Sequence, residues 1–277
     1  MTMDVLAETV ALLMKEAAAE IVMPRFRALA AHEIEEKSPT DLVTIADREA
    51  ELWLSPRLER LVAGSRVLGE EAAAAAPALL SHLHDDTPLW TVDPVDGTGN
   101  FAAGRETFGL MIALVEQGQT RRAWIYLPIE QELAVAEQGG GAVWIDASGA
   151  HRLEAGCPTA NPASQHASFY TRFMPEDWKK GIESYAANVG STSAFLCSAV
   201  DYTNVARGRH DFITYHRMLP WDHAPGSLIL REAGGVVRNL ETDEDYAPRT
   251  LEGPHLVARD EESWERVAAA IREGRGG

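Results

Sequence analysis

The pattern of apolar and polar residues predicts helices for most of the first part of the chain. Between residues 3 and about 31, apolar residues recur at helical spacing among good helix formers, which indicates one long helix, bent near Pro24. A short apolar run at Leu42–Ile45 predicts a strand. A second helix is expected from Asp47 to about residue 63, with Asp47 as its N-cap.

Strand patterns follow in the middle of the chain, where short apolar runs are separated by Gly-containing turns. The Ala-rich stretch at 72–84 fits either a helix or a loop. Gly139–Gly141 is not a dinucleotide fingerprint, because no helical pattern follows it. The predicted strands are Val67–Glu71, Leu89–Val92, Phe108–Glu116, Ala123–Leu127, Glu132–Glu137 and Ala142–Ile145, the last two forming a hairpin.

The second half of the chain changes character after a Pro/Gly/Ala-rich stretch at Leu153–Ser164. This stretch is the predicted boundary between an N-terminal half, residues 1–152, and a C-terminal half, residues 153–277. Strands and helices then alternate, which predicts α/β layering. The expected strands are His166–Tyr170, Asp211–Tyr215, Val236–Val237 and His255–Ala258, and the expected helices are Glu176–Val189, Ser198–Gly208, Ser227–Ala233 and Trp264–Ile271.

Composition is that of a globular protein, with 45% hydrophobic and 24% charged residues. The formal net charge of −17 argues against nucleic-acid binding through a basic surface. The two cysteines make no disulfide framework or zinc pattern. Charged residues interrupt the apolar N-terminus, so neither a signal peptide nor a membrane span is expected there. We therefore expect a soluble, cytoplasmic protein with neither nucleic acid nor membrane as a partner.

The stretch at 90–101 carries the densest candidate chemistry. An apolar run ends at Asp93, Pro94 stops sheet pairing, and Asp96-Gly97 is a strong turn pair followed by the Thr98 hydroxyl. Paired hard oxygens suit Mg²⁺, and clustered backbone N–H groups suit a phosphate. A plain Asp-Gly turn explains this stretch equally well, whereas an EF-hand lacks its ladder of acids. Because the chain is acidic, a phosphate site here requires bound divalent cations.

Four segments together resemble the inositol monophosphatase family of Mg²⁺-dependent sugar phosphatases, in the family order and at compatible spacing. The resemblance covers nearly the whole chain, and its central Asp-Pro-x-Asp-Gly-Thr-x-Asn-Phe motif is highly specific. The segments are Lys37–Asp47, Gly69-Glu70-Glu71, Asp93–Phe101, and Trp221–Gly226 followed by Gly234-Gly235.

The resemblance implies a site for two to three Mg²⁺ ions. Asp93 would bridge two ions, with Glu70 and the Val95 carbonyl on one, and Asp96 with Asp222 on the other. A third, weaker ion would sit near the Glu70 carboxylate. Two such ions can clamp the attacking and leaving oxygens of an in-line displacement.

The resemblance also implies how the reaction proceeds. The family uses a metal-bound water as the nucleophile and orients and deprotonates it with a Thr–Asp pair, here Thr98 and Asp47. Backbone N–H groups of Gly97 and Thr98 would hold the phosphate, and Lys37 would help to neutralise the site. No phospho-enzyme is needed, so neither cysteine has an expected role. On the residues alone, Asp47 as a helix cap and Lys37 as a solvated loop charge are complete explanations too.

The sequence departs from the family on the substrate side. Inositol-preferring members place a Glu where Tyr215 stands here, and Leu196 replaces a Gly just before Ser198. We expect Ser198, Tyr215 and Asp222 on the substrate side of the site. His216 and Arg217 either recognise a second anionic group or are surface charges. The phosphatase prediction survives these departures, while inositol specificity is weakened.

His223 is expected to be structural, because imidazole is a poor match for Mg²⁺. By resemblance, the fold is a layered αβαβα sandwich of mixed α/β class, the protein is a homodimer, and it is sensitive to lithium. The expected reaction is hydrolysis of a small phosphate monoester such as inositol monophosphate. Alternative substrates are histidinol phosphate, a 3′-phosphonucleotide or fructose 1,6-bisphosphate, and a rival of another class is a non-catalytic regulatory homologue.

Overall fold

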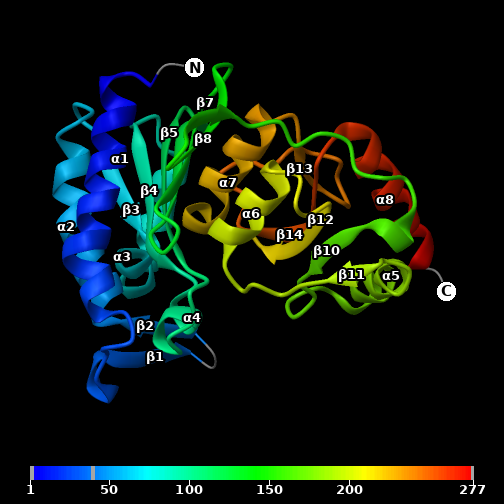
Figure 1. The fold of residues 1–277 in the computed structure, drawn as a ribbon, viewed down its shortest axis with the longest axis horizontal. Coiled ribbons are helices and arrows are strands. Elements are labelled where there is room, and N and C mark those ends of the chain that lie inside the picture. Colours follow the sequence, from blue (N-terminus) through cyan, green and yellow to red (C-terminus); the bar gives the residue numbers. More distant parts are fainter. Residues whose placement is uncertain (1–2, 39–40, 276–277) are drawn as a thin grey trace.

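The chain folds into alternating layers of helices and sheets (Figure 1). The structure, a computed structural model, describes residues 3–38 and 41–275. Helices α1 (Val5–Ala17) and α2 (Ile45–Glu59) cover the outer face of the first sheet, and α6 (Ser198–Ala206) and α7 (Pro220–Glu232) fill the space between the two sheets. Helices α5 (Glu176–Ala186) and α8 (Glu261–Gly274) cover the second sheet. The predicted αβαβα sandwich is confirmed.

The first sheet has seven strands in sequence order from β3 to β9. Neighbouring strands are antiparallel except β3 and β4, which are parallel. Every residue of β4 is buried, which suits its position between α2 and the inner helices. The strands are β3 (Arg66–Gly69), β4 (Leu89–Asp96), β5 (Gly109–Glu116), β6 (Gln119–Leu127), β7 (Glu132–Glu137), β8 (Gly141–Asp146) and β9 (Gly149–Arg152).

The second sheet is mixed and has five strands in the order β11-β10-β12-β14-β13. Strand β10 is parallel to both β11 and β12, whereas β14 is antiparallel to β12 and β13. The predicted alternation of strands and helices in this half is thus confirmed. The strands are β10 (His166–Phe169), β11 (Ser191–Thr192), β12 (Phe212–Arg217), β13 (Val236–Asn239) and β14 (Glu252–Ala258).

The largest core joins the two sheets. It contains buried residues of β5–β8 from the first half and of α6, α7, β12 and β14 from the second. Helices α6 and α7 approach closely at Gly226, where a Cβ would lie 2.2 Å from the Tyr202 ring. Only a glycine leaves this space, so Gly226 allows the inner helical layer to pack tightly.

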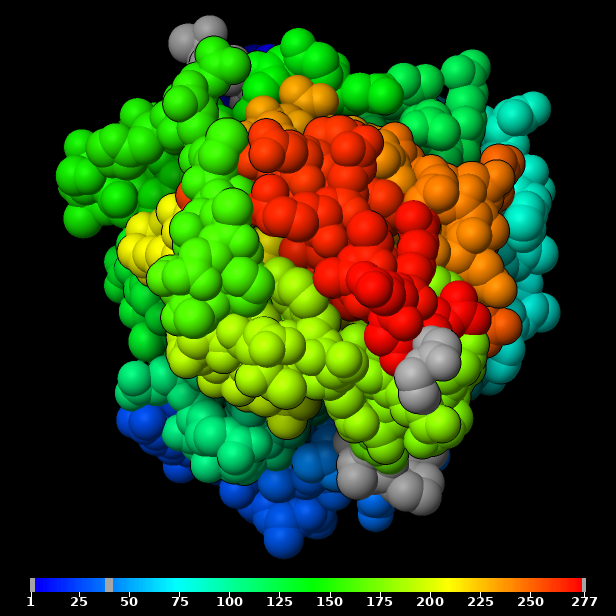
Figure 2. Space-filling model, turned by 90° about the vertical axis from the view of Figure 1, so that its right-hand side faces the viewer, coloured from blue at the N-terminus to red at the C-terminus, as the bar shows by residue number. Residues whose placement is uncertain are grey.

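The connection between the sheets, residues 153–165, runs over the surface from β9 to β10 (Figure 1). It includes a short 3₁₀ turn at Pro162–Ser164. Figure 2 shows it in green beside the red helix α8, on the face farthest from α1 and α2. The chain thus passes from the first sheet to the second in the stretch where the sequence predicts a boundary. The division into halves at residue 152 stays a prediction.

The N-terminal helix is shorter than predicted. Helix α1 continues as a π-helical turn (Ala18–Val22) and a 3₁₀ turn (Met23–Arg25), and then ends. The prediction of a bent helix to residue 31 is wrong. Pro24 lacks a backbone N–H, and the helical stretch ends one residue after it instead of continuing with a bend. A separate 3₁₀ turn at Ala31–Glu33 leads into β1 (Ile34–Ser38).

Strand β1 was not predicted, and it changes the setting of Lys37. It pairs antiparallel with β2 (Asp41–Thr44), so Lys37 lies in a strand and not in a loop. Pro39 and Thr40, part of the family-like segment, lie outside the described residues. Helix α2 starts at Ile45 with Thr44 as its N-cap, and Asp47 is the third helical residue of a capping box. The prediction that Asp47 is the N-cap is wrong.

Two other helix boundaries matter for the site. The predicted strand Val67–Glu71 ends at Gly69, because Glu70 begins helix α3 (Glu70–Ala75). Helix α7 begins at Pro220, well before the predicted start at Ser227. Proline is favoured at the first helical position, so Pro220 starts the helix, and Pro225 lies inside it. The sequence left the stretch 72–84 as either a helix or a loop. It is mostly helical: α3 ends at Ala75, and a 3₁₀ helix follows at Pro77–His84.

Among the described residues, no helix is both long and apolar enough to cross a membrane.

Candidate active site

The end of β4 places two carboxylates at one turn. The register against β5 shifts between Asp93 and Asp96, which marks a bulge around Pro94, a residue that cannot donate to the ladder. Gly97 then adopts a left-handed conformation with a φ of 84° and leads into the short helix α4 (Thr98–Ala102). The chain therefore turns sharply after β4 and holds both carboxylates, which are buried, at the end of this strand.

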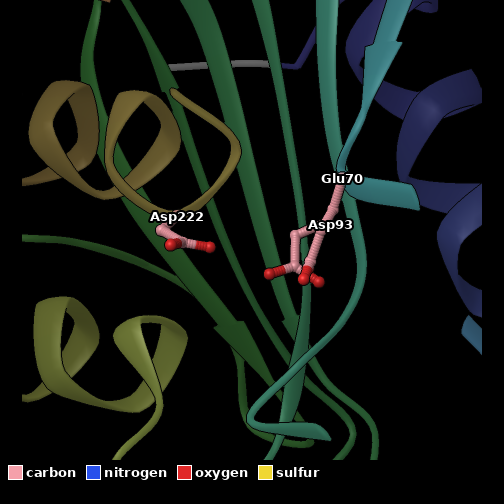
Figure 3. Close-up of side chains that lie close together, drawn as sticks. All are labelled: Glu70, Asp93 and Asp222. Carbon is pink, nitrogen blue, oxygen red and sulfur yellow. The ribbon is translucent and has the colours of Figure 1, made fainter. Parts of the chain in front are cut away.

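Three carboxylates from different elements converge beside this turn. Glu70 is the first residue of α3, Asp93 lies on β4, and Asp222 lies in the first turn of α7. Each contributes an oxygen, and these oxygens all lie within 4.8 Å of one another. Figure 3 shows Asp222 approaching from the α7 side, across from Glu70 and Asp93. Both halves of the chain therefore build the cluster.

Burial raises the pKa of each carboxyl in this cluster. Desolvation is the largest cause for Asp93, whose pKa lies well above its usual range, and the neighbouring carboxylates raise it further. Desolvation likewise raises the pKa of Glu70 well above its usual range and that of Asp222 to about 7. Like charges this close together require either bound protons or compensating positive charge.

Lys37 supplies one such charge. Its Nζ lies 2.7 Å from Glu70 Oε1 and 2.9 Å from Glu71 Oε1, and its side chain is 17% exposed. Although Lys37 lies in a strand, the ion pair brings it to the place where a site-neutralising role was predicted.

The donor set fits a hard divalent cation. All three converging groups are carboxylates, and Mg²⁺ prefers oxygen ligands and keeps several waters, so a few carboxylates suffice. One lysine cannot balance three negative charges in this buried to half-buried cluster, whereas the lysine together with a divalent cation would. The Val95 carbonyl, the fourth predicted ligand of this region, accepts a hydrogen bond from Thr98 Oγ1 at 3.0 Å.

Asp96 is held apart from the three-carboxylate cluster by the second half of the chain. Its Oδ2 accepts a hydrogen bond from the Ala199 backbone N–H at 2.6 Å and lies 3.0 Å from the Cys197 thiol. Cys197 is buried, and desolvation raises its pKa well above the usual range, so the thiol is a donor and not a nucleophile here. The predicted metal ligand Asp96 thus also joins β4 to the start of α6.

Thr98 and Asp47 meet as the sequence predicts. Thr98 Oγ1 lies 2.9 Å from Asp47 Oδ1, although the residues are 51 positions apart. Asp47 Oδ2 accepts hydrogen bonds from the Thr44 N–H at 2.9 Å and from the Thr44 hydroxyl at 2.5 Å. Asp47 is fully buried, and this desolvation raises its pKa to about 6 despite the hydrogen bonds. Asp47 therefore caps the first turn of α2 and also binds Thr98 in the turn after β4.

A cavity of about 420 Å³ opens in front of these groups, within the usual size of small-molecule sites. The predicted residues Gly97, Thr98 and Ser198 line it together with the carboxylates. Tyr215 lines it too, but its hydroxyl lies 3.2 Å from Asp201 Oδ2 and its ring stacks between two other tyrosines. The Tyr215 side chain is therefore fixed by contacts within the protein.

His223 faces the protein with both ring nitrogens. Nε2 lies 2.9 Å from the Arg217 carbonyl and Nδ1 lies 3.0 Å from the Tyr202 hydroxyl. Burial lowers its pKa to about 3, so the ring is neutral near neutral pH. These contacts agree with a structural part in joining β12, α6 and α7.

Sequence comparison connects this geometry to known proteins. Residues 3–275 match the sequence profile of the Inositol monophosphatase family. The chain belongs to this family. The inositol-1-monophosphatase of Bacillus subtilis is 31% identical over 229 residues, covering 82% of each protein. The Nus factor SuhB of Pseudomonas aeruginosa is 27% identical, covering 95% of this chain and 94% of that protein.

A solved structure supports the same assignment. The extragenic suppressor protein suhB from Bartonella henselae superposes with a TM-score of 0.78 at 27% identity, covering 96% of this chain and 99% of that one. The shared fold therefore covers 96% of the chain. The acidic cluster lies where the family motifs meet.

Several residues of the cavity were not predicted as site residues. Asp201 is buried, with Oδ2 2.7 Å from the Tyr170 hydroxyl, and desolvation raises its pKa to about 7. Arg105 and Arg172 also line the cavity. These two arginines lie in loops that carry no sequence motif, so their place at the site is visible only in the folded structure. Cys197 could have been predicted from the sequence, because it stands between Leu196 and Ser198 on the expected substrate side.

Proposed function

We propose that the protein is a Mg²⁺-dependent phosphomonoesterase that hydrolyses a small phosphorylated metabolite by in-line attack of water. One observation carries the proposal: the cluster of Glu70, Asp93 and Asp222 lies at the same turn as the hydrogen-bonded pair Thr98 and Asp47. Paired acids alone are common in proteins. A buried acid cluster beside a hydroxyl–carboxylate pair, in a cavity of substrate size, fits phosphate ester hydrolysis.

Thr98 and Asp47 move the proton in this proposal. The Thr98 hydroxyl, held by Asp47 and the Val95 carbonyl, orients the attacking water and relays its proton to Asp47. A pKa of about 6 leaves Asp47 ionised at neutral pH, yet basic enough to accept a proton. Burial of Asp47 and its hydrogen bonds to Thr44 keep this carboxylate in one position.

The acidic residues hold the cations. Glu70, Asp93 and Asp222 would hold them together, and Asp96 and the Val95 carbonyl, which the family resemblance implies as further ligands, would complete the proposed set. When bound, two to three Mg²⁺ ions supply charge stabilisation for the transferring phosphoryl group and activate water. Lys37 adds a further positive charge at Glu70.

The phosphate and the leaving group face the remaining cavity. We assign the phosphate to the backbone of Gly97 and Thr98, and the leaving group to the region of Ser198 and Tyr215. Inositol 1-phosphate, histidinol phosphate, 3′-phosphoadenosine 5′-phosphate and fructose 1,6-bisphosphate are the first substrates to test. Along with the phosphatase assignment we propose lithium sensitivity, a homodimer and a cytoplasmic location without a nucleic-acid partner.

The decisive experiment measures phosphate release from this panel with Mg²⁺ and with EDTA. Asp93→Asn keeps the size of the side chain but removes its charge, so turnover should become undetectable. Asp86→Asn makes the same charge change at an exposed position outside the cavity and should leave activity unchanged. Near-normal activity of Asp93→Asn would refute the proposal. A folded, Mg²⁺-binding protein that hydrolyses none of the panel would favour the non-catalytic alternative.

A further inference from the structure

Besides the acidic cluster, the cavity is lined by three arginines. Arg105 follows α4, Arg172 follows β10, and Arg217 ends β12, and all three line the cavity. His216 lines it next to Arg217. The chain as a whole carries a net charge of −17, and five acids also line the cavity, so these three arginines supply the positive charge that an anionic ligand can meet there. Positive side chains in a cleft attract and orient anions.

Arg105 is built into the cavity wall. Its Nε donates a hydrogen bond of 2.9 Å to Asn100 Oδ1. Asn100 is only 5% exposed and is itself fixed, because its Nδ2 donates to the Thr107 and Phe195 carbonyls, each at 2.8 Å. One end of the guanidinium is thus anchored to a buried amide.

Arg217 is positioned by an irregular strand end. The register of β12 against β14 shifts between Tyr215 and Arg217, and the Arg217 carbonyl accepts a hydrogen bond from buried His223 at 2.9 Å. Within residues 3–38 and 41–275, neither Arg105 nor Arg217 forms an ion pair with an acid. Both remain able to bind an anionic ligand.

The rim also carries exposed apolar surface. Phe173 and Leu196 are 54% and 64% exposed, and both line the cavity. Leu196 has a φ of 53°, a left-handed conformation that is unfavourable for leucine, and its N–H is held by the Tyr170 hydroxyl at 3.1 Å. The Arg172 guanidinium lies 5.0 Å from the Phe173 ring centre.

We infer that the substrate is a phosphomonoester whose organic part carries a second anionic group, bound by Arg217 and Arg105, and an apolar face that contacts Phe173 and Leu196. The inference rests on the proposed function and narrows its substrate class. The Tyr215 hydroxyl already donates to Asp201, so it cannot donate to a polyol hydroxyl at the same time. An anionic group would gain charge-assisted hydrogen bonds from the guanidinium groups.

A matched substrate pair tests the inference. Carboxyphenyl and carbamoylphenyl phosphates, each as the 3- and 4-isomer, have the same shape and differ in one negative charge. We expect kcat/KM to be at least about tenfold higher for one carboxylate isomer than for its amide, mainly through KM. The preference should shrink with added salt. Equal kcat/KM for both members of each pair would overturn the inference while leaving the phosphatase assignment intact. No hydrolysis of either pair by a protein that hydrolyses the metabolite panel would also overturn the inference, whereas no hydrolysis of either pair or of the panel would refute the phosphatase assignment.

Variants locate the second subsite. Arg217→Met and Arg105→Met should each reduce the carboxylate preference by about tenfold, whereas Arg60→Met, an equal charge change at an exposed residue outside the cavity, should preserve it. If Arg217 only balances the acidic cluster, Arg217→Met will change both substrates alike, which would contradict the inference. Circular dichroism and thermal melting check the folding of each variant, and the substrate pair tests the inference on the unaltered protein.

Discussion

Single residues in this site have two roles at once. Asp47 accepts hydrogen bonds from Thr44 at the start of α2 and from Thr98 across the site. Asp96 shares an edge of the cavity with Thr98 and is bound by the start of α6. Side chains with both a structural and a chemical role are held rigidly, and pre-organisation of this kind is what a catalytic group needs.

Asp47→Asn should remove the proton acceptor while retaining the side-chain shape. We expect kcat to fall by about 10²–10⁴ with a smaller change in KM, as is typical for loss of a general base. In the unaltered protein kcat should fall as the pH drops through about 6, because the Asp47 carboxylate then takes up a proton. This acid limb should be missing from the residual activity of Asp47→Asn. An unchanged kcat in the variant would exclude Asp47 as the base.

At the scale of elements, a carboxylate on α2 positions α3 and with it Glu70. Glu51 is 6% exposed, and its two oxygens accept the backbone N–H groups of Glu71 and Ala72, each at 2.8 Å. A Cβ on Gly69 would lie 2.1 Å from the Glu51 carboxyl carbon. The glycine of the Gly-Glu-Glu motif is therefore required so that Glu51 can reach the first turn of α3.

Glu51→Gln replaces one of these acceptors by an NH₂ group, so one buried N–H loses its partner. The free energy of unfolding should fall by about 1–3 kcal/mol, and Mg²⁺ affinity should fall about tenfold or more because Glu70 is less firmly placed. Urea denaturation and calorimetric Mg²⁺ titration measure the two effects. Glu59→Gln, at an exposed position near the end of the same helix, is the control. Full Mg²⁺ affinity in Glu51→Gln would show that α3 is positioned by other contacts.

At the scale of the whole molecule, the site spans the two halves. Glu70 and Asp93 come from the first half and Asp222 from the second, and the largest core also contains residues of both. A cation bound by these three carboxylates would link the halves and relieve their mutual repulsion. We therefore expect the two sheets to unfold together, and metal binding to stabilise the whole chain.

Removal of divalent cations should lower the melting temperature. At a free Mg²⁺ concentration of 100 Kd, the linkage predicts about 2.7 kcal/mol of stabilisation relative to EDTA at equal ionic strength. Differential scanning calorimetry should show one transition that moves upward with Mg²⁺, and a much smaller shift for Asp93→Asn. A melting temperature independent of Mg²⁺ would contradict the proposed metal site.

Local physics made much of this molecule predictable from its sequence. Alternation of short apolar runs with Gly-containing turns predicted most of both sheets, since side-chain period and turn chemistry act over a few residues. The motif around Asp93 and Thr98 is equally local, and its residues do meet at one turn. Asp47 and Thr98 were paired by family resemblance, and the fold places them 2.9 Å apart.

Tertiary structure decided what depends on distant partners. Strand β1 exists because it pairs with β2, and Lys37 reaches Glu70 only from there. The early start of α7 places Asp222 in a helical turn. Arg105 and Arg172 of the cavity rim had no local signal, and Arg217 was left open between a ligand contact and a surface charge. The pairing of strands, the burial of side chains and the gathering of charged residues at one cavity depend on which segments pack together. The sequence alone therefore determined the acidic motif and the family of the chain, and the fold decided which side chains surround that motif.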